Sequence, residues 1–262
     1  MTVRSHTLVV GGTRGIGRTV ARFLADEGDA VSIVGRSRPT WIDEHPQIRA
    51  WTADAGDARE LARALAEVVG EAGSVTSAVL LQRYRGSGDE WAGEIATSVT
   101  ATRHLLEWAG EHLEDRGRGK AVVVVSSIAG VYVAQEQSAS YHMAKAAMTQ
   151  LVRYYAVTLG KRGVRVNAIS PGTIVKDESK PFYQDHPDLE QLYRDIIPVG
   201  RMGTAIDVAH VTQFLLSDRA SFLTGQNIVL DGGASLHAPE ALARQVSPLR
   251  DLQVSRPKVQ KV

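Results

Sequence analysis

The segment Tyr141-His142-Met143-Ala144-Lys145 places a phenol and an ammonium group four residues apart. The residues around it predict a helix, on which this spacing brings both groups to one face. A fixed neighbouring cation favours the phenolate form and moves the tyrosine pKa towards values useful for proton transfer near neutral pH. Tyr141 is therefore a candidate proton donor, with Lys145 as the charge that activates it.

A candidate third group, Ser127, precedes Tyr141 by fourteen residues. It follows a run of valines that predicts a buried strand, so its hydroxyl is expected at the carboxyl edge of a sheet. There it could polarise a substrate carbonyl while Tyr141 supplies a proton. The alternative is that the serine pair Ser126-Ser127 only caps the end of the strand.

A glycine-rich turn is predicted between the first apolar run and the first helical pattern, at 11–17 (GGTRGIG). Glycines permit a tight turn and let backbone N–H groups approach a pyrophosphate. At a strand-to-helix junction such a turn predicts binding of a dinucleotide, and a purely structural turn is the alternative. The residues expected to contact the cofactor here are Gly11, Thr13, Arg14, Gly15, Ile16 and Gly17.

Apolar runs and helical patterns alternate along the chain and supply the scaffold that must position these groups. Strands are predicted at 7–10, 30–34, 48–52, 77–81, 120–126, 164–169 and 227–230. Helices are predicted after the glycine turn and at 58–71, 91–114, 139–160 and 204–217. This alternation predicts an α/β fold: a doubly wound, Rossmann-type parallel seven-stranded sheet with helices on both faces. Ligands are then expected at the carboxyl ends of the strands.

We expect one domain over 1–262, because a chain of this length with 44% hydrophobic residues can bury a single sizeable core. The stretch 173–200 is too long for a plain connector and is predicted to be a substrate lid. Its apolar residues either contact a partly apolar substrate or only pack the lid shut. The tail at 234–262 either packs on a partner subunit or frays, and fraying is the favoured interpretation.

Composition excludes several classes of function. The 30 basic and 29 acidic residues leave a net charge of +1, so no overall field favours a nucleic acid or a membrane surface. The absence of cysteine excludes disulfides, thiol catalysis and cysteine-ligated zinc, and no metal site is predicted. No apolar run reaches the roughly 18 residues of a membrane span, and no signal peptide pattern is present. A cytoplasmic protein with a small-molecule partner is expected.

Taken in this order and spacing, these blocks resemble the short-chain dehydrogenase/reductase family, most closely its 3-oxoacyl carrier-protein reductases, over about residues 5–235. Further blocks that carry the resemblance are 164–173 (VRVNAISPGT), 199–203 (VGRMG), 224–226 (TGQ) and 231–233 (DGG). The resemblance implies that Ser127 and Tyr141 act on a carbonyl, while Lys145 lowers the tyrosine pKa and holds the nicotinamide ribose. It also implies cofactor contacts from Asp54, Gln82, Pro171, Gly172, Thr173 and Ile174.

The sequence departs from the family pattern at three places. Val10 replaces a threonine, which removes a local hydrogen bond but keeps the turn. Residues 80–83 (LLQR) replace Asn-Asn-Ala-Gly, so large side chains stand where small ones usually let the adenosine ribose approach. Ser98 stands where the family has a fourth catalytic residue, an asparagine that helps to hold a water in the proton relay.

These departures leave two functions open. The first is an active carbonyl reductase in which Ser98 is a candidate catalytic residue. The second is a nucleotide-binding regulatory or scaffold protein that has lost catalytic power. Within the atypical segment, Arg83 and Arg85 either meet an anion of the substrate or cofactor or are merely exposed at the surface, and the role of Tyr84 stays open.

The end of the second strand, at 32–38 (SIVGRSR), predicts which dinucleotide binds. Relatives that use NAD usually place an acid here, which accepts hydrogen bonds from the ribose 2′-hydroxyl and repels a 2′-phosphate. Arg36 instead offers a planar cation suited to that phosphate. Arg14 could approach from the opposite side, and Ser37 or Arg38 could assist. NADP(H) is therefore the predicted cofactor, and arginines that only decorate a surface loop are the alternative.

The two longest predicted helices carry apolar residues on more than one face. Part of that surface is expected to need a partner, and the family resemblance suggests a homodimer or homotetramer formed through these helices. The residues concerned are Ile95, Val99, Leu105, Leu106, Met148, Leu151, Val152 and Tyr155.

Overall fold

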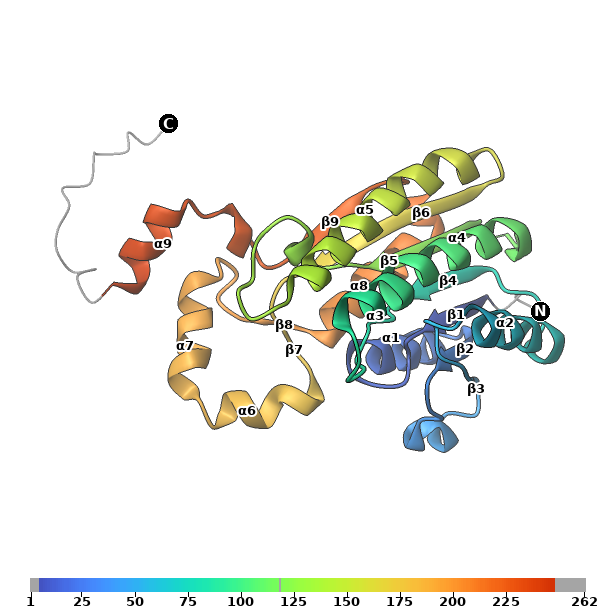
Figure 1. Cartoon of the computed structure of the whole chain (residues 1–262), viewed down its shortest axis with the longest axis horizontal. Helices are drawn as coiled ribbons and strands as arrows, with labels where there is room; N and C mark the ends of the chain where they lie inside the picture. Colours follow the sequence, from blue (N-terminus) through green and yellow to red (C-terminus); the bar gives the residue numbers. More distant parts are fainter. Residues whose placement is uncertain (1–4, 118, 248–262) are drawn as a thin grey trace.

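The computed structural model describes residues 5–117 and 119–247. Its central sheet comprises β1 (His6–Val10), β2 (Ala30–Gly35), β3 (Ile48–Thr52), β4 (Ser77–Leu80), β5 (Lys120–Val125), β6 (Val164–Pro171) and β9 (Asn227–Leu230). These seven strands are parallel and lie in the order β3-β2-β1-β4-β5-β6-β9 (Figure 1). The predicted doubly wound, Rossmann-type sheet is confirmed.

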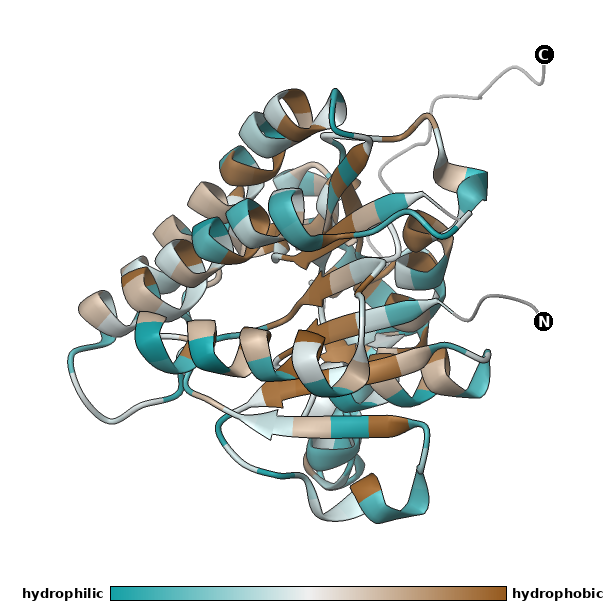
Figure 2. Cartoon of the chain, turned by 90° about the vertical axis from the view of Figure 1, so that its right-hand side faces the viewer, coloured by the Kyte–Doolittle hydropathy of each residue, from teal (hydrophilic) through white to brown (hydrophobic). Residues whose placement is uncertain are grey.

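Helices cover both faces of this sheet. The main ones are α1 (Gly15–Asp26), α2 (Ala58–Ala72), α4 (Ala101–His112), α5 (Ala139–Gly160) and α8 (Ala205–Leu216). Apolar residues of α2, α4 and α5 share one buried cluster with the sheet, whereas those of α1 and α8 share another. The sheet therefore runs between two layers of helices, and its strands form the apolar centre of the molecule (Figure 2).

The valine run in β5 shows why the sheet is buried on both sides. Val122 and Val124 point into the cluster of α2, α4 and α5, whereas Val123 and Val125 point into the cluster of α1 and α8. Successive side chains of a strand alternate between its two faces, so a strand with two covered faces needs an uninterrupted apolar run.

The helix predicted at 91–114 is interrupted, so this prediction was wrong in its continuity. The structure has α3 (Glu90–Glu94), a π-helical turn (Ile95–Thr100) and then α4. A π turn adds a residue to the helical repeat and rotates the side chains that follow it, which is a feature often found at functional sites. Here it turns Thr97 and Ser98 into the interior.

The predicted lid is partly helical. It contains β7 (Ile174–Val175), a 3₁₀ turn (Asp177–Ser179), α6 (Lys180–Gln184) and α7 (Pro187–Ile196), and β7 pairs with β8 (Gly203–Thr204). Helix α9 (Pro239–Val246) lies against α7, and the amide of Gln245 donates to the Asp195 carbonyl (Figure 1). The expectation of a frayed tail was therefore wrong for 234–247, and 248–262 lie outside the described residues.

The apolar residues expected to seek a partner lie mostly inside the protomer. Leu105, Leu106, Met148, Val152 and Tyr155 are buried in the cluster beneath α4 and α5. Periodicity could not separate a helix face that packs on the sheet from one that packs on a second subunit. These five residues therefore carry no argument for assembly, and the oligomeric state remains a prediction. No helix within 5–117 and 119–247 is long and apolar enough to cross a bilayer.

Candidate functional site

A cavity of about 690 Å³ opens at the carboxyl ends of β1 and β4, where the strand order changes direction. This switch point is where doubly wound sheets bind ligands. Most of the predicted cofactor residues line it: Gly11, Thr13, Arg14, Gly15, Ile16, Gly17, Arg36, Ser37, Asp54, Gln82, Tyr141 and Lys145. Pro171, Gly172, Thr173, Ile174, Ser98 and Ser127 are not among the lining residues. Their assigned roles remain predictions.

The glycine turn between β1 and α1 is closed by backbone packing. A Cβ on Gly17 would lie 2.2 Å from the carbonyl oxygen of Gly11. Gly11 itself has φ of +86°, and a Cβ there would lie 2.8 Å from the backbone between Leu81 and Gln82. Only glycine fits either position, so α1 packs against the turn at Gly17, and the turn packs at Gly11 against the chain that follows β4.

The first N–H groups of α1 face this cavity and already hold an anion from the chain itself. Gly15 N–H donates to Glu178 Oε1 at 3.0 Å, and Arg18 pairs with Asp177 at 2.6 Å. Burial alone would raise the pKa of Glu178, but hydrogen bonds from its own backbone N–H and from Gly15 lower it overall. A helix N-terminus favours negative charge, so the segment predicted as a lid supplies a carboxylate at an anion site. Sequence reasoning missed this contact, which joins segments far apart in the chain.

Tyr141 and Lys145 meet the cavity from the first turns of α5. Lys145 is only 4% exposed, and its Nζ lies 5.5 Å from the centre of the Tyr141 ring. The ammonium donates to the Val125 carbonyl at 3.3 Å. Burial lowers the pKa of Lys145 to about 8, the charge of Glu94 raises it and the charge of Arg83 lowers it. Lys145 is therefore largely charged at neutral pH and loses its proton as the pH rises above about 8.

Ser126 and Ser127 make different contacts. Ser126 lines the cavity and its hydroxyl donates to the Lys145 carbonyl at 3.0 Å, which ties β5 to α5. Ser127 Oγ accepts the N–H of Ala129 at 3.1 Å and so caps the 3₁₀ turn Ile128–Gly130. That bond uses an acceptor lone pair of Ser127 and leaves its hydroxyl hydrogen for another partner.

Ser98 lies behind the cavity together with an acid that sequence reasoning missed. Ser98 is fully buried, and its hydroxyl donates to Glu94 Oε2 at 2.5 Å. Glu94 is 1% exposed, and its charge raises the pKa of Lys145. The available signal was an acid one helical turn before Ser98, on the same face.

The atypical segment after β4 enters the cavity. Arg83 Cζ lies 4.3 Å from the centre of the Tyr141 ring, and Nη2 donates to Gln137 Oε1 at 2.7 Å. The interpretation of Arg83 as merely exposed was wrong, whereas Arg85 is exposed at the edge of the cavity. The Gln82 amide donates to Thr102 Oγ1 at 2.9 Å, and its buried Oε1 has no partner among the residues that the structure describes.

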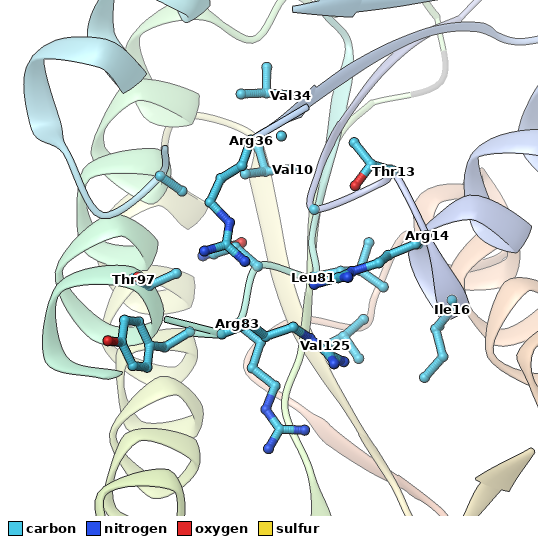
Figure 3. Close-up of a pocket in the computed structure, with 18 of the residues that line it drawn as sticks. Val10, Thr13, Arg14, Ile16, Val34, Arg36, Leu81, Arg83, Thr97 and Val125 are labelled. Atoms are coloured by element: carbon cyan, nitrogen blue, oxygen red, sulfur yellow. The ribbon is translucent and has the colours of Figure 1, made fainter. Parts of the chain in front are cut away.

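Positive charge dominates this cavity. Figure 3 shows Arg36 and Arg14 reaching into it from opposite sides, with Arg83 below them. Partial burial lowers the pKa of Arg85, and the charges of Arg83 and Arg14 lower it further. Mutual repulsion of this kind is offset when an anionic ligand binds. The charged residues of the lining are six cations, Arg14, Arg36, Arg83, Arg85, Lys145 and Lys176, and two acids, Asp54 and Glu178.

Known proteins share this sequence pattern along most of the chain. The family model described as enoyl-(acyl carrier protein) reductase matches residues 10–235. A 3-oxoacyl-[acyl-carrier-protein] reductase of Staphylococcus aureus is 31% identical over 254 residues, which cover 89% of this chain and 99% of that protein. An L-rhamnose 1-dehydrogenase (NAD(P)(+)) of Azotobacter vinelandii is 30% identical over 247 residues, covering 86% of this chain and 94% of that protein.

Solved structures of short-chain dehydrogenases/reductases superpose on this chain over most of its length. A short-chain type dehydrogenase/reductase from Mycobacterium ulcerans superposes with a TM-score of 0.76 at 31% identity, covering 94% of this chain and 96% of that one. A short-chain dehydrogenase/reductase from Serratia marcescens superposes with a TM-score of 0.77 at 24% identity, covering 90% of this chain and all of that one, and supports the fold alone.

Proposed function

Because this chain belongs to the short-chain dehydrogenase/reductase family of NAD(P)-dependent oxidoreductases, we propose that it is an NADPH-dependent reductase that converts a ketone to an alcohol. The observation that carries the proposal is the pairing of Tyr141 with Lys145 beside the glycine turn. Their 5.5 Å separation, measured from Nζ to the ring centre, gives a proton donor and an activating cation in one cavity.

The cavity suits the proposed cofactor. Its cations at the glycine turn and at the end of β2 match a ligand with several phosphate charges, and a pyrophosphate at the N-terminus of α1 would displace the Glu178 carboxylate from Gly15 N–H. Arg36 and Arg14 are the residues that would hold a ribose 2′-phosphate, and Asp54 would contact the adenine end. The bound cofactor supplies a hydride to the carbonyl carbon.

The protein's own groups manage the proton and the developing charge. Tyr141 donates its phenolic proton to the carbonyl oxygen of the substrate, and Ser127 donates a hydrogen bond to the same oxygen. Lys145 stays protonated below its pKa of about 8 and stabilises the tyrosinate that remains. We further propose a cytoplasmic homodimer or homotetramer, for which the exposed Tyr154 and Val157 of α5 offer apolar contacts.

The competing function is a nucleotide-binding regulatory or scaffold protein, and the replacement of asparagine by Ser98 favours it. NADPH oxidation with a panel of ketones, measured at high protein concentration, separates the two. We expect NADPH consumption that depends on both ketone and protein. Tight NADPH binding without consumption for any ketone would support the regulatory function instead.

Replacing Glu178 by glutamine is expected to strengthen NADPH binding. The Glu178 carboxylate occupies Gly15 N–H, where it competes with a phosphate and repels it. An exposed charge at a helix N-terminus contributes about 0.3–1 kcal/mol, so the Kd should fall about two- to fivefold. Fluorescence titration with NADPH measures this change. Asp188→Asn, an exposed acid elsewhere in the lid, should leave the Kd unaltered, and an unaltered Kd in Glu178→Gln would refute the competition.

Replacing Glu94 by glutamine is expected to move the alkaline limb of the pH–rate profile to lower pH. Glu94 raises the pKa of Lys145, so its neutral replacement lets Lys145 lose its proton earlier. A shift of about one pH unit would reduce kcat at pH 8 by roughly fivefold, with little change at pH 6. Profiles of kcat for both proteins test this. Glu111→Gln, an exposed acid on α4, serves as control, and coincident limbs would contradict the coupling.

A further inference from the structure

Arg83 brings a positive charge to the reacting end of the cavity. It belongs to the segment between β4 and α3, and its Cζ lies 4.3 Å from the centre of the Tyr141 ring. This is closer than the Lys145 ammonium, whose Nζ lies 5.5 Å from the same point. A guanidinium stacked on the face of the phenol ring lies close to the Tyr141 hydroxyl, the group that would donate the proton.

The protein itself leaves this charge largely unbalanced. Nη2 donates to the neutral amide of Gln137, and the buried Nε has no partner among the described residues. No described carboxylate approaches the Arg83 guanidinium within 4.0 Å. A partly buried cation is normally paired, because its transfer out of water is costly. An anion is therefore expected to approach Arg83 from the cavity.

The phosphates of the cofactor are not the best match for that anion. Arg14 and Arg36 stand at the ends of the glycine turn and of β2, and Gly15 N–H already forms an anion site there. Arg83 instead stacks on the group that serves the substrate carbonyl. The anion it faces therefore belongs to the substrate.

We infer that Arg83 binds a carboxylate that the substrate carries close to its reacting carbonyl, which makes the substrate an oxo acid. The planar fork of a guanidinium matches the two oxygens of a carboxylate. This inference rests on the proposed function, since Tyr141 sets the position of the carbonyl.

Matched neutral and anionic ligands test the inference. Acetoacetate and acetoacetamide carry the same ketone and differ in charge, so their affinities for the protein saturated with NADP⁺ can be compared by calorimetry. We expect acetoacetate to bind at least about tenfold more tightly, the effect of one charge-assisted hydrogen-bonded pair. Equal affinities, tighter binding of the amide, or no measurable binding of acetoacetate would overturn the inference.

Variants assign the preference to Arg83. Arg83→Gln should weaken acetoacetate binding by about tenfold or more and change acetoacetamide binding less than about twofold, while Arg83→Lys retains part of the preference. Arg153→Gln, an exposed arginine further along α5, should retain it fully. Equal weakening of both ligands in Arg83→Gln would reveal a general role in holding Tyr141 and would contradict carboxylate binding.

Measurements of turnover distinguish a failure of this inference from a failure of the proposed carbonyl reductase. If NADPH is oxidised equally well with acetoacetate and acetoacetamide, carbonyl reduction stands and the role of Arg83 is refuted. If acetoacetate binds selectively through Arg83 but neither compound is reduced, the oxo-acid site stands and the proposed reductase fails for these ligands.

Discussion

Replacing Tyr141 by phenylalanine should reduce kcat by at least about 100-fold while NADPH binding stays within about twofold. The ring and its packing under Arg83 remain, and only the proton donor is lost. An enzyme without that donor must draw the proton from solvent, so its residual rate should fall as pH rises. Steady-state kinetics and fluorescence titration on the same preparation measure both quantities.

A second tyrosine on the same helix provides the matched control. Tyr154 is 60% exposed on α5, so Tyr154→Phe removes a phenolic hydroxyl away from the cavity and should leave kcat unchanged. Unchanged turnover in Tyr141→Phe would remove the residue from the mechanism. A parallel loss of NADPH affinity would instead show that the hydroxyl serves binding.

Replacing Arg36 by aspartate should abolish or reverse the preference for NADPH over NADH. We expect the unaltered protein to prefer NADPH by at least about tenfold in kcat/KM, because one charge-assisted hydrogen bond to the 2′-phosphate contributes about 1.5–3 kcal/mol. Arg36 lines the cavity and forms no ion pair with any carboxylate in the described part of the chain. Aspartate would repel the phosphate and accept hydrogen bonds from an unmodified ribose.

Kinetics with both dinucleotides test this preference. Arg22→Asp makes the same change of charge on an exposed position of α1 outside the cavity and should keep the preference. Equal efficiency of the two dinucleotides in the unaltered protein would show that Arg36 does not recognise the phosphate. Arg14 reaches the same space from the other side, so its own replacement should weaken NADPH binding more than NADH binding (Figure 3).

Features that depend on local sequence could be predicted. The valine run of β5 predicted a sheet with two covered faces, and the glycine turn predicted a dinucleotide site; the structure has such a sheet and a cavity beside the turn. The helical spacing of Tyr141 and Lys145 likewise predicted that they lie close together on one helix face, and both line that cavity. Each of these inferences relates residues within one or two elements, where periodicity and backbone geometry decide the outcome.

Features that depend on distant contacts could not be predicted. Glu178 reaches Gly15 across most of the chain, and Arg83 reaches the ring of Tyr141 from another strand end. The apolar faces of α4 and α5 gave no sign of whether a sheet or a partner covers them. The burial of Glu94 was harder still to predict, since a charged residue inside a helix normally indicates a solvated face. Only the π turn and the fold together reveal that it lies near Lys145.

Transfer of deuterium from the cofactor to a product tests the central claim most directly. The protein is incubated with NADPH deuterated at the transferred position of nicotinamide C4 and with ketones that include acetoacetate, and the products are analysed by mass spectrometry and NMR. Direct hydride transfer predicts an alcohol with one deuterium on the former carbonyl carbon, formed in amounts equal to the NADP⁺ released. Binding of the nucleotide with no deuterated alcohol from any ketone would contradict carbonyl reduction by this protein.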